Sequence, residues 1–396
     1  MKLNLLKAWY SLLITFFICC ERLEFLKPID GMHIKHYLLM ITIVLSLIVL
    51  NGKKLKQVKE FIPVFVSAGI LYIISLAFQI KEGAFKRYSL EEVYYFIIPL
   101  IFAIILLNST AKNYLDDYIN LMFNVSILSL IYIFISSGNF SLGNFIALFN
   151  LKNLFIDSTS PIKESDLSIY FTIFYIYYSY KNDRKRRIAA FIFSFLSYKR
   201  FSVLFVILCA VFLKFIPRHK KVPKLIYYFA IIAFIIAPFV VYYMCDDTFV
   251  SWFYRKTGVD FNYFTMSRLE IINAVIDAHL TNYGLGTTSY FLESRGRTGQ
   301  FNMHNDILRI YMETTIIGTI TFTYSYFKIT KHNIYEFIIM LFIFFELFVA
   351  HFLASGTITL WILTFMILMQ MNIDEESYKK KLVQIAEENK APKAIA

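Results

Sequence analysis

The chain of 396 residues is too apolar for a water-soluble domain, since 58% of its residues are hydrophobic, 18% are aromatic and only 17% are charged. Soluble domains carry about 25% charged residues, so this composition excludes an ordinary globular enzyme and fits a protein dissolved in lipid. The net charge of +12 does not call for a nucleic-acid partner, because excess lysine and arginine in a membrane protein first serves to orient its loops.

The amino-terminal segment has the outline of a signal peptide, with Lys2 and Lys7 ahead of the apolar stretch 8–20. No small-residue cleavage site follows, because Glu21 and Arg22 come directly after it. We therefore expect a retained first helix whose positive end stays in the cytoplasm.

Twelve apolar runs, give or take one, could cross a bilayer, and several are shorter than the roughly 20 residues of a full span. Short runs are expected to tilt, to thin the bilayer or to re-enter it. The sequence thus predicts an all-α fold, a polytopic helical membrane protein with about 12 transmembrane helices. The runs are 8–20, 35–50, 61–80, 93–108, 118–137, 167–180, 188–198, 201–216, 225–244, 306–327, 334–352 and 356–372.

The clusters of lysine and arginine predict the orientation, because loops rich in these residues stay in the cytoplasm. Alternation from a cytoplasmic amino terminus puts the densest clusters inside, whereas the loop 245–305 is close to neutral and falls outside. Both chain termini are then cytoplasmic. The inside clusters lie at 53–56, 181–187, 218–224, 328–331 and 379–381.

No internal repeat and no flexible linker divides the chain. Residues 1–372 are therefore predicted to form a single transmembrane domain, and 373–396 a short cytoplasmic tail. The domain includes two external loops, a moderate one at 138–166 and a large one at 245–305. The four cysteines form no CxxC pair and have no ligand spacing, so they indicate neither a disulfide framework nor a metal site.

The apolar run 188–216 is interrupted by Lys199 and Arg200. Because the basic segments 181–187 and 217–224 belong on the same side, the chain must cross twice, and the Lys199–Arg200 pair marks the external turn. The eleven residues before the turn rise about 16 Å as a helix, little over half of a roughly 30 Å core. Arg200 is therefore expected below the external surface, either facing a cavity or simply snorkelling to the interface.

The large external loop contains a helical signal. The S-x-x-E spacing that begins at Ser267 is that of a capping box, and apolar residues follow at helical spacing. A helix is predicted from about 268 to 280, ending near Gly284 and Gly286, which can adopt left-handed or closely packed backbone. Arg268 would stand in its first turn, where a cation is mildly unfavourable against the helix dipole unless an anion is shared there.

The large loop ends in His304 and Asn305, directly before an apolar run. The simplest interpretation is that Asn305 or Asp306 caps the next helix, which leaves His304 and Arg309 unexplained. Arg309 and Glu313 lie four residues apart on one helix face, so an internal ion pair is the plain explanation. Ionisable residues at that depth nevertheless favour a cavity wall over lipid.

The order of these residues resembles that of the O-antigen ligases and Wzy-type O-antigen polymerases, which build capsular, exopolysaccharide and other surface glycans. The resemblance covers Arg200 and roughly 268–318, and elsewhere only the hydropathy agrees. Departures are Thr315, where the family often has glycine, and Lys199, where a serine usually precedes the arginine. The matching positions are Arg268, Gly284, Leu285, Gly286, His304, Asn305, Leu308, Glu313 and Gly318.

The resemblance implies a GT-C-like glycosyltransferase architecture and a location in the bacterial cytoplasmic membrane. It implies polymerisation of undecaprenyl-pyrophosphate-linked repeat units by glycosyl transfer at the outer face, without metal, nucleotide sugar or other cofactor. Implied partners are the bilayer, the lipid-linked donor and acceptor glycans and, as candidates, a chain-length regulator and a flippase, but no nucleic acid. The residues implied for catalysis are His304, Arg268 and Arg200, and those implied for substrate binding are Asn305, Arg309, Gly284, Gly286 and Lys199.

The chemistry of these residue types suits that reaction. Guanidinium groups of Arg200 and Arg268 could hold the pyrophosphate through bidentate hydrogen bonds while charge builds on the leaving group. His304 could accept the proton of the attacking sugar hydroxyl, a general-base role suited to an imidazole. Asn305 is expected to orient that histidine or to cap the helix.

Three alternatives remain open at the level of sequence. A ligase would transfer the same glycan to a lipid or protein acceptor. A lipid-linked oligosaccharide flippase would not need a folded external loop and often shows half-to-half symmetry, which is not detectable here. A metal-dependent glycosyltransferase would normally place an acidic pair in its first external loop, but Glu21, Glu24 and Asp30 lack a D-x-D or E-x-D spacing.

Overall fold

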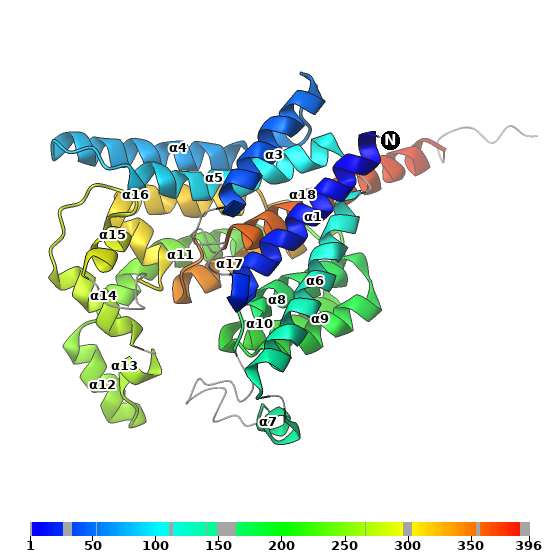
Figure 1. The fold of residues 1–396 in the computed structure, drawn as a ribbon. Helices are drawn as coiled ribbons and strands as arrows, with labels where there is room; N and C mark the ends of the chain where they lie inside the picture. Colours follow the sequence, from blue (N-terminus) through cyan, green and yellow to red (C-terminus); the bar gives the residue numbers. More distant parts are fainter. Residues whose placement is uncertain are drawn as a thin grey trace, which may run out of the picture.

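The computed structural model describes residues 2–26, 34–52, 54–110, 114–139, 141–148, 164–265, 267–295, 303–353 and 357–388. Throughout these ranges the regular secondary structure is helical and no strand occurs (Figure 1), which confirms the all-α prediction. The helices that match predicted membrane runs are α1 (Lys2–Arg22), α3 (Ile34–Leu50), α4 (Val58–Lys81), α5 (Tyr88–Ser109), α6 (Tyr114–Ser137), α8 (Leu167–Lys181), α9 (Arg184–Ser197), α10 (Arg200–Phe212), α11 (Lys224–Met244), α16 (Asp306–Lys328), α17 (Ile334–Val349) and α18 (Ile358–Glu388).

Five of the described helices, α4, α5, α6, α11 and α18, are long and apolar enough to cross a membrane, judged by length and composition. They fit a multi-pass membrane protein. Each predicted run does form a helix, but α9 has 14 residues and α10 has 13. At 1.5 Å per residue, such helices are about 20 Å long, shorter than a roughly 30 Å hydrocarbon core. A total of about twelve crossings therefore stays a prediction.

The outer faces of several helices are apolar. On α11, Leu225, Phe229 and Ile232 are exposed, and on α3 Ile41 and Ile48 are exposed. Soluble monomers rarely present apolar surface on this scale. Helices satisfy their own backbone hydrogen bonds, so such faces can lie against lipid without cost to the main chain.

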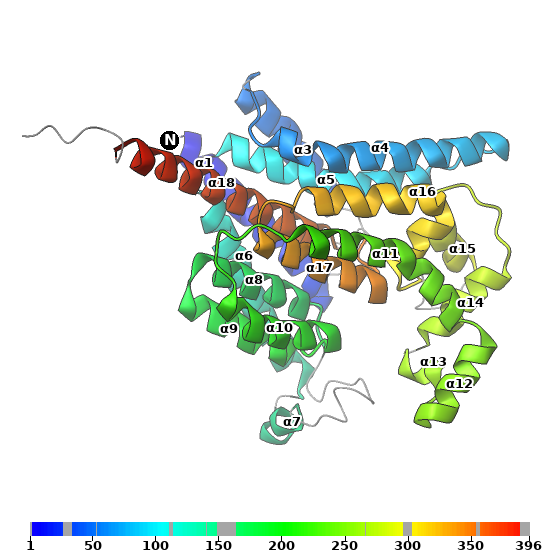
Figure 2. The same ribbon diagram turned by 180° about the vertical axis from the view of Figure 1, so that it is seen from behind.

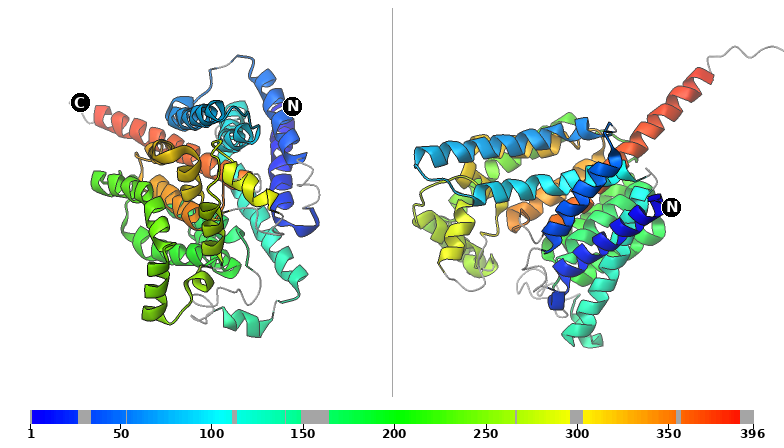
Figure 3. Two further views of the ribbon diagram at one scale, coloured as in Figure 1. Left: turned by 90° about the vertical axis from the view of Figure 1, so that its left-hand side faces the viewer. Right: turned by 45° about the horizontal axis from the view of Figure 1, so that its top comes forward.

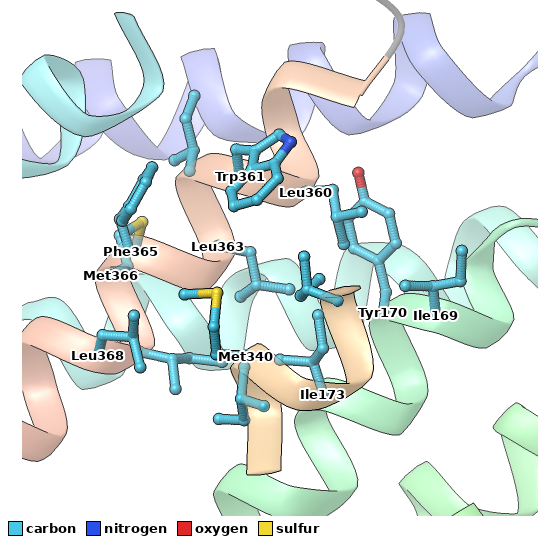
Figure 4. Packing of buried hydrophobic residues seen from close by; sticks show 14 of the residues in the cluster. Ile169, Tyr170, Ile173, Met340, Leu360, Trp361, Leu363, Phe365, Met366 and Leu368 are labelled. Carbon is cyan, nitrogen blue, oxygen red and sulfur yellow. The ribbon is translucent and has the colours of Figure 1, made fainter. Parts of the chain in front are cut away.

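The carboxyl-terminal helix α18 runs through the middle of the bundle, and its apolar part packs against α8 and α17 (Figure 4). Leu363 and Met366 of α18 are fully buried and lie in one cluster with Met340 of α17 and Ile173 of α8. Trp361 Nε1 donates to the Phe352 carbonyl at 2.8 Å, which ties α18 to the segment that follows α17.

Ion pairs of two lysines lie at one end of the bundle. Lys7 bonds Asp117 at 2.8 Å, and Lys181 bonds Asp116 at 2.8 Å and Asp374 at 3.0 Å. The amino terminus and the far part of α18 lie toward this end, away from α12 and α13 (Figure 3). These contacts place Lys7, Lys181 and the far part of α18 at one end, whereas the grouping of all five basic segments on one side, and the identity of that side as cytoplasmic, stay predictions.

The opposite end carries the large loop, which forms α12 (Asp247–Thr257), α13 (Phe261–Phe264), α14 (Arg268–Asp277) and α15 (Thr287–Ser294). These short helices project from the ends of α11 and α16 (Figure 2). Helix α14 confirms the predicted loop helix. The predicted capping box is wrong, because Ser267 has φ 60° and makes no side-chain cap. Asn262 Oδ1 accepts the Glu270 N–H at 3.3 Å instead.

The predicted loop at 138–166 is described only in part. Its described pieces include α7 (Leu142–Ala147), and residues 149–163 lie outside the described ranges. Two short 3-10 turns complete the described elements, η1 (Glu24–Leu26) and η3 (Leu213–Phe215).

Helix α16 is bent at Thr315, whose backbone is non-helical with φ 64° and ψ −176°. This region of conformational space is used almost only by glycine, the residue that the resembled family often has here. Three residues later, a Cβ at Gly318 would overlap Thr314 and come within 3.0 Å of Leu71. Helices α4 and α16 therefore approach closely at this point, despite the threonine.

Candidate functional site

Four of the predicted polar residues line a single cavity of about 170 Å³, here called the arginine cavity. They are Arg200, Arg268, His304 and Asn305. These residues come from three chain segments that together span more than a hundred residues, so the fold itself brings them together. The rest of the wall is mostly apolar and includes Phe201, Val241, Met244, Cys245, Phe261, Phe264, Leu269, Ile272, Phe348 and Val349.

The short helices α9 and α10 position Arg200. Helix α9 ends at Ser197, Tyr198 adopts left-handed φ of 52°, and Arg200 begins α10. The Ser165 N–H donates to the Ser197 carbonyl at 2.9 Å, which fixes the turn. The predicted turn at Lys199–Arg200 is confirmed, and the side chain of Arg200 faces the cavity, as the cavity interpretation expected.

Arg268 begins α14, so its charge stands at the amino-terminal end of a helix. Helix α14 is fixed by an apolar cluster that joins Ile271 and Val275 to Val241 of α11 and Leu308 of α16. Among the described residues, Arg268 has no side-chain hydrogen bond or ion pair that would occupy its guanidinium. A partly buried cation at the positive end of a helix dipole is unfavourable by itself, so the site is suited to an anion.

The charges around Arg268 support that conclusion. Burial lowers the pKa of Arg268 first, the nearby Arg200 guanidinium lowers it further, and the carboxylates of Glu164 and Glu346 oppose the shift. Two like charges held near one another disfavour the doubly charged state. An anion placed between two guanidinium groups would relieve that repulsion and could accept bidentate hydrogen bonds from both.

His304 lies at the junction between the large loop and α16. Its φ of 51° is unusual for a residue other than glycine, and such strain is concentrated at functional sites. Burial, followed by the neighbouring Arg268, His351 and Lys199 in that order, lowers the pKa of His304 to about 4. The imidazole is therefore neutral at physiological pH and able to accept a proton.

Asn305 is the cap of α16. Its side-chain oxygen accepts the Leu308 N–H at 2.9 Å. Of the two predicted roles for Asn305, the structure supports capping. The described residues give no hydrogen bond between Asn305 and the His304 ring.

Arg309 lies outside the arginine cavity, in a buried ion-pair network. Its guanidinium group forms ion pairs with the carboxylates of Glu92 at 2.9 Å and Asp306 at 3.1 Å, and the Glu313 carboxylate lies 4.0 Å from it. Its side chain also donates to the Leu353 carbonyl at 3.2 Å. The plain explanation of an internal ion pair accounts for Arg309, and the cavity gives it no contact with a substrate.

Gly284 and Gly286 also lie outside the cavity, where they anchor the large loop to the bundle. Both have positive φ, at 90° and 85°, and a Cβ on Gly284 would overlap Ser75 of α4. The Gly286 N–H donates to Glu313 Oε2 at 2.9 Å, and the Thr288 N–H donates to the other carboxylate oxygen at 2.9 Å. The glycines thus shape the loop, as expected, rather than contact the cavity.

Lys199 turns away from the arginine cavity. Its Nζ bonds Asp166 at 2.8 Å and lies over the Phe352 ring at 4.7 Å. Neighbouring carboxylates raise the pKa of Lys199 against the opposite effect of burial, so the ammonium stays charged. The lysine therefore holds the turn before Arg200 in place and contributes positive charge without lining the cavity.

Sequence reasoning missed a second histidine. His351 Nδ1 lies 2.7 Å from Asp306 Oδ1, and because a carboxylate only accepts, the Nδ1–H donates. Asp306 is fully buried and also accepts from the backbone N–H groups of Phe352 and Leu353, at 2.5 and 2.9 Å. His351 is close enough to His304 to lower its pKa. No local signal could reveal this pair, because 45 residues separate its members.

The described residues contain no cluster of His, Cys, Asp and Glu arranged as a metal site. Comparison of the chain with family models, with curated proteins and with solved structures gave no match. The geometry of the arginine cavity is therefore the main guide to function.

Proposed function

We propose that this protein polymerises undecaprenyl-pyrophosphate-linked oligosaccharide repeat units by metal-independent glycosyl transfer at the outer face of the bacterial cytoplasmic membrane. One observation carries the proposal: a single cavity joins two guanidinium groups and an imidazole to a wall of apolar side chains. A polyprenyl diphosphate is complementary to such a cavity, because its dianionic head can bind the guanidinium groups and its apolar tail can contact the apolar wall. The proposal includes about twelve membrane crossings and a GT-C-like architecture.

In this account, Arg200 and Arg268 bind the diphosphate that links lipid to glycan. When the bond between the anomeric carbon and the diphosphate oxygen breaks, the head group changes from a diester with about two negative charges to a monoester with about three. Guanidinium groups stabilise that added charge more than the charge of the bound donor, which is what lowers a barrier. The leaving group departs as undecaprenyl pyrophosphate.

The acceptor is a sugar hydroxyl whose oxygen attacks the anomeric carbon. Its proton passes to neutral His304, the imidazole that lines the same cavity. A base with a pKa near 4 is weak at neutral pH. A bound diphosphate offsets the positive charge of Arg268, which would raise the pKa of His304 and strengthen it as a base when the donor is present.

The test is the replacement of Arg268 and His304 in cells that make the polysaccharide. Because His304 has positive φ, His304→Asn, which tolerates this conformation, accompanies His304→Ala. Loss of one transition-state hydrogen-bond donor costs about 100-fold or more in rate, so Arg268→Ala should abolish long chains. Single lipid-linked repeats should accumulate, as measured by gel analysis of the glycan and extraction of the lipid fraction.

Matched controls come from the same loop. Arg255 is an exposed arginine of α12 whose side chain bonds only its own helix among the described residues, so Arg255→Ala should leave chain length unchanged. Normal chain length in the Arg268 and His304 variants, with protein present in the membrane, would defeat the proposal. Loss of glycan attachment to a non-polymer acceptor, with chain length preserved, would indicate a ligase instead.

A further inference from the structure

A second cavity, of about 370 Å³, lies beside the first at the same end of the bundle. It is formed where α1, η1 and α6 meet the segment before α8. Its wall is rich in carboxylates, hydroxyls and aromatic rings and has one cation. The residues that matter for its chemistry are Glu21, Arg22, Glu24, Phe25, Tyr132 and Glu164, together with Asp166 and the hydroxyls of Ser136 and Ser165.

The two cavities have no lining residue in common, but neighbouring residues connect them. Asp166 lines the second cavity, and its Oδ1 accepts from Lys199 Nζ at 2.8 Å. Lys199 directly precedes Arg200, which lines the arginine cavity. Glu164 also lines the second cavity and interacts electrostatically with both Arg200 and Arg268. A single ion pair and one peptide bond therefore connect lining residues of the two cavities.

Opposite charge distinguishes the two cavities. The arginine cavity has two guanidinium groups and no carboxylate in its described wall, whereas the second has four carboxylates and one guanidinium. A diphosphate would be repelled from the second cavity. Carboxylates accept hydrogen bonds and donate none when ionised, so this wall is suited to a ligand that is rich in hydroxyl donors.

Arg22 provides a second sign of a polar ligand. Its side chain is only 7% exposed, and its terminal nitrogens bond Asp166 at 3.2 Å and the Tyr170 hydroxyl at 3.3 Å. Its Nε–H is buried with no partner among the described residues. A buried donor without an acceptor costs free energy, so the polar groups at this wall are not fully hydrogen-bonded among the described residues.

Aromatic rings complete the wall. Phe25 and Tyr132 meet edge to face at 5.6 Å, and 59% and 44% of their surfaces are exposed. Rings that present an apolar face beside polar groups suit a sugar, whose C–H faces are apolar and whose rim carries hydroxyls. Carboxylates, a buried N–H donor and aromatic faces thus match one ligand class.

We propose that the second cavity binds the hydroxyl-bearing terminal sugar of the acceptor glycan and presents it to the arginine cavity. This inference rests on the proposed function and deepens it, since glycosyl transfer needs an anionic donor head and a neutral acceptor side by side. The second cavity is therefore an acceptor site, and Glu164 and Tyr132 recognise the sugar. A flippase would have no need of two adjoining cavities of opposite charge.

The experiment measures binding of two probes to the full chain in lipid nanodiscs. Undecaprenyl pyrophosphate probes the arginine cavity, and the repeat-unit oligosaccharide, released from its lipid by mild acid, probes the acceptor site. Glu164→Gln and Tyr132→Ala should each weaken oligosaccharide binding about tenfold, the size expected when a hydrogen bond to a charged group is lost. Tyr132→Ala should bind undecaprenyl pyrophosphate as the natural protein does. Glu164→Gln should bind it no more weakly, because the substitution removes a negative charge that interacts with Arg200 and Arg268. Arg268→Ala should show the reverse pattern.

Two exposed residues outside the second cavity serve as controls. Leu128 lies one turn before Tyr132 on the same helix, and Glu293 is an exposed carboxylate of α15. Leu128→Ala and Glu293→Gln should bind both probes normally. Oligosaccharide binding that is absent in the natural protein, or unchanged in Glu164→Gln and Tyr132→Ala, would overturn the acceptor site alone. Failure of undecaprenyl pyrophosphate to bind, or binding insensitive to Arg268→Ala, would instead overturn the proposed function.

Discussion

The imidazole of His304 lies in surroundings that favour its neutral form. Burial and the neighbouring cations Arg268 and Lys199, together with His351, hold its pKa at about 4. The same cations attract a diphosphate, whose negative charge would raise the pKa of the imidazole. The base and the anion site are therefore coupled, and the histidine gains basicity only when the donor occupies the cavity.

This coupling predicts a difference between two pH profiles. Activity is lost when His304 is protonated, so it should fall as pH drops through the pKa of that histidine. The limb seen in kcat/KM reports the free protein and should lie near pH 4, as the lowered pKa requires. The limb seen in kcat reports the complex and should lie at higher pH, because the bound anion raises the pKa. Acid limbs that coincide near pH 6.5 in both profiles would contradict the coupling.

At the scale of elements, hydropathy predicted where the helices lie, because each apolar run must satisfy its backbone within a helix. The periodicity at 268–280 likewise predicted α14. The cap of that helix could not be predicted, since Asn262 supplies it from a separate helix. The partner of Arg309 could not be predicted either. Glu92 reaches Arg309 only because α5 packs against the large loop and α16. Local sequence patterns therefore predicted the helices, whereas the partners of the charged side chains depend on contacts between distant parts of the chain.

The glycines of the large loop provide a test at this scale. Gly284 has positive φ and no room for a Cβ beside Ser75, whereas Gly258 has positive φ and nothing within 4 Å. Gly258→Ala should cost about 1 kcal/mol, from backbone strain alone. Gly284→Ala should cost about 2 kcal/mol or more, because overlap is added and the loop must move away from α4. Thermal unfolding of the purified protein compares the two, and equal losses of stability would show that the loop is not anchored there.

Across the whole molecule, polar groups lie at the two ends of the bundle and exposed apolar faces lie between them. Ion pairs such as Lys181–Asp374 lie at one end, together with the amino terminus. Both cavities lie at the other end, and residues of the large loop line the arginine cavity. Exposed apolar faces such as that of α11 lie between these ends. This arrangement is suited to lipid-linked substrates, since the apolar tail and the polar head can both reach one end of the bundle.

Labelling with a membrane-impermeant maleimide would test the predicted orientation. In a variant without the four natural cysteines, Arg255→Cys in α12 should react in intact cells, and Lys379→Cys in α18 should react only after the membrane is opened. Both positions are exposed, so accessibility depends on the side of the membrane and not on burial. The opposite pattern of labelling would place the arginine cavity on the cytoplasmic side and would exclude an outer-face reaction.

Reconstitution of the purified protein in liposomes with lipid-linked repeat units as sole substrate tests the central claim most directly. The account predicts longer lipid-linked chains and release of one undecaprenyl pyrophosphate for each new glycosidic bond, with neither product from the Arg268→Ala variant. Movement of intact lipid-linked units across the bilayer without any new glycosidic bond would contradict it.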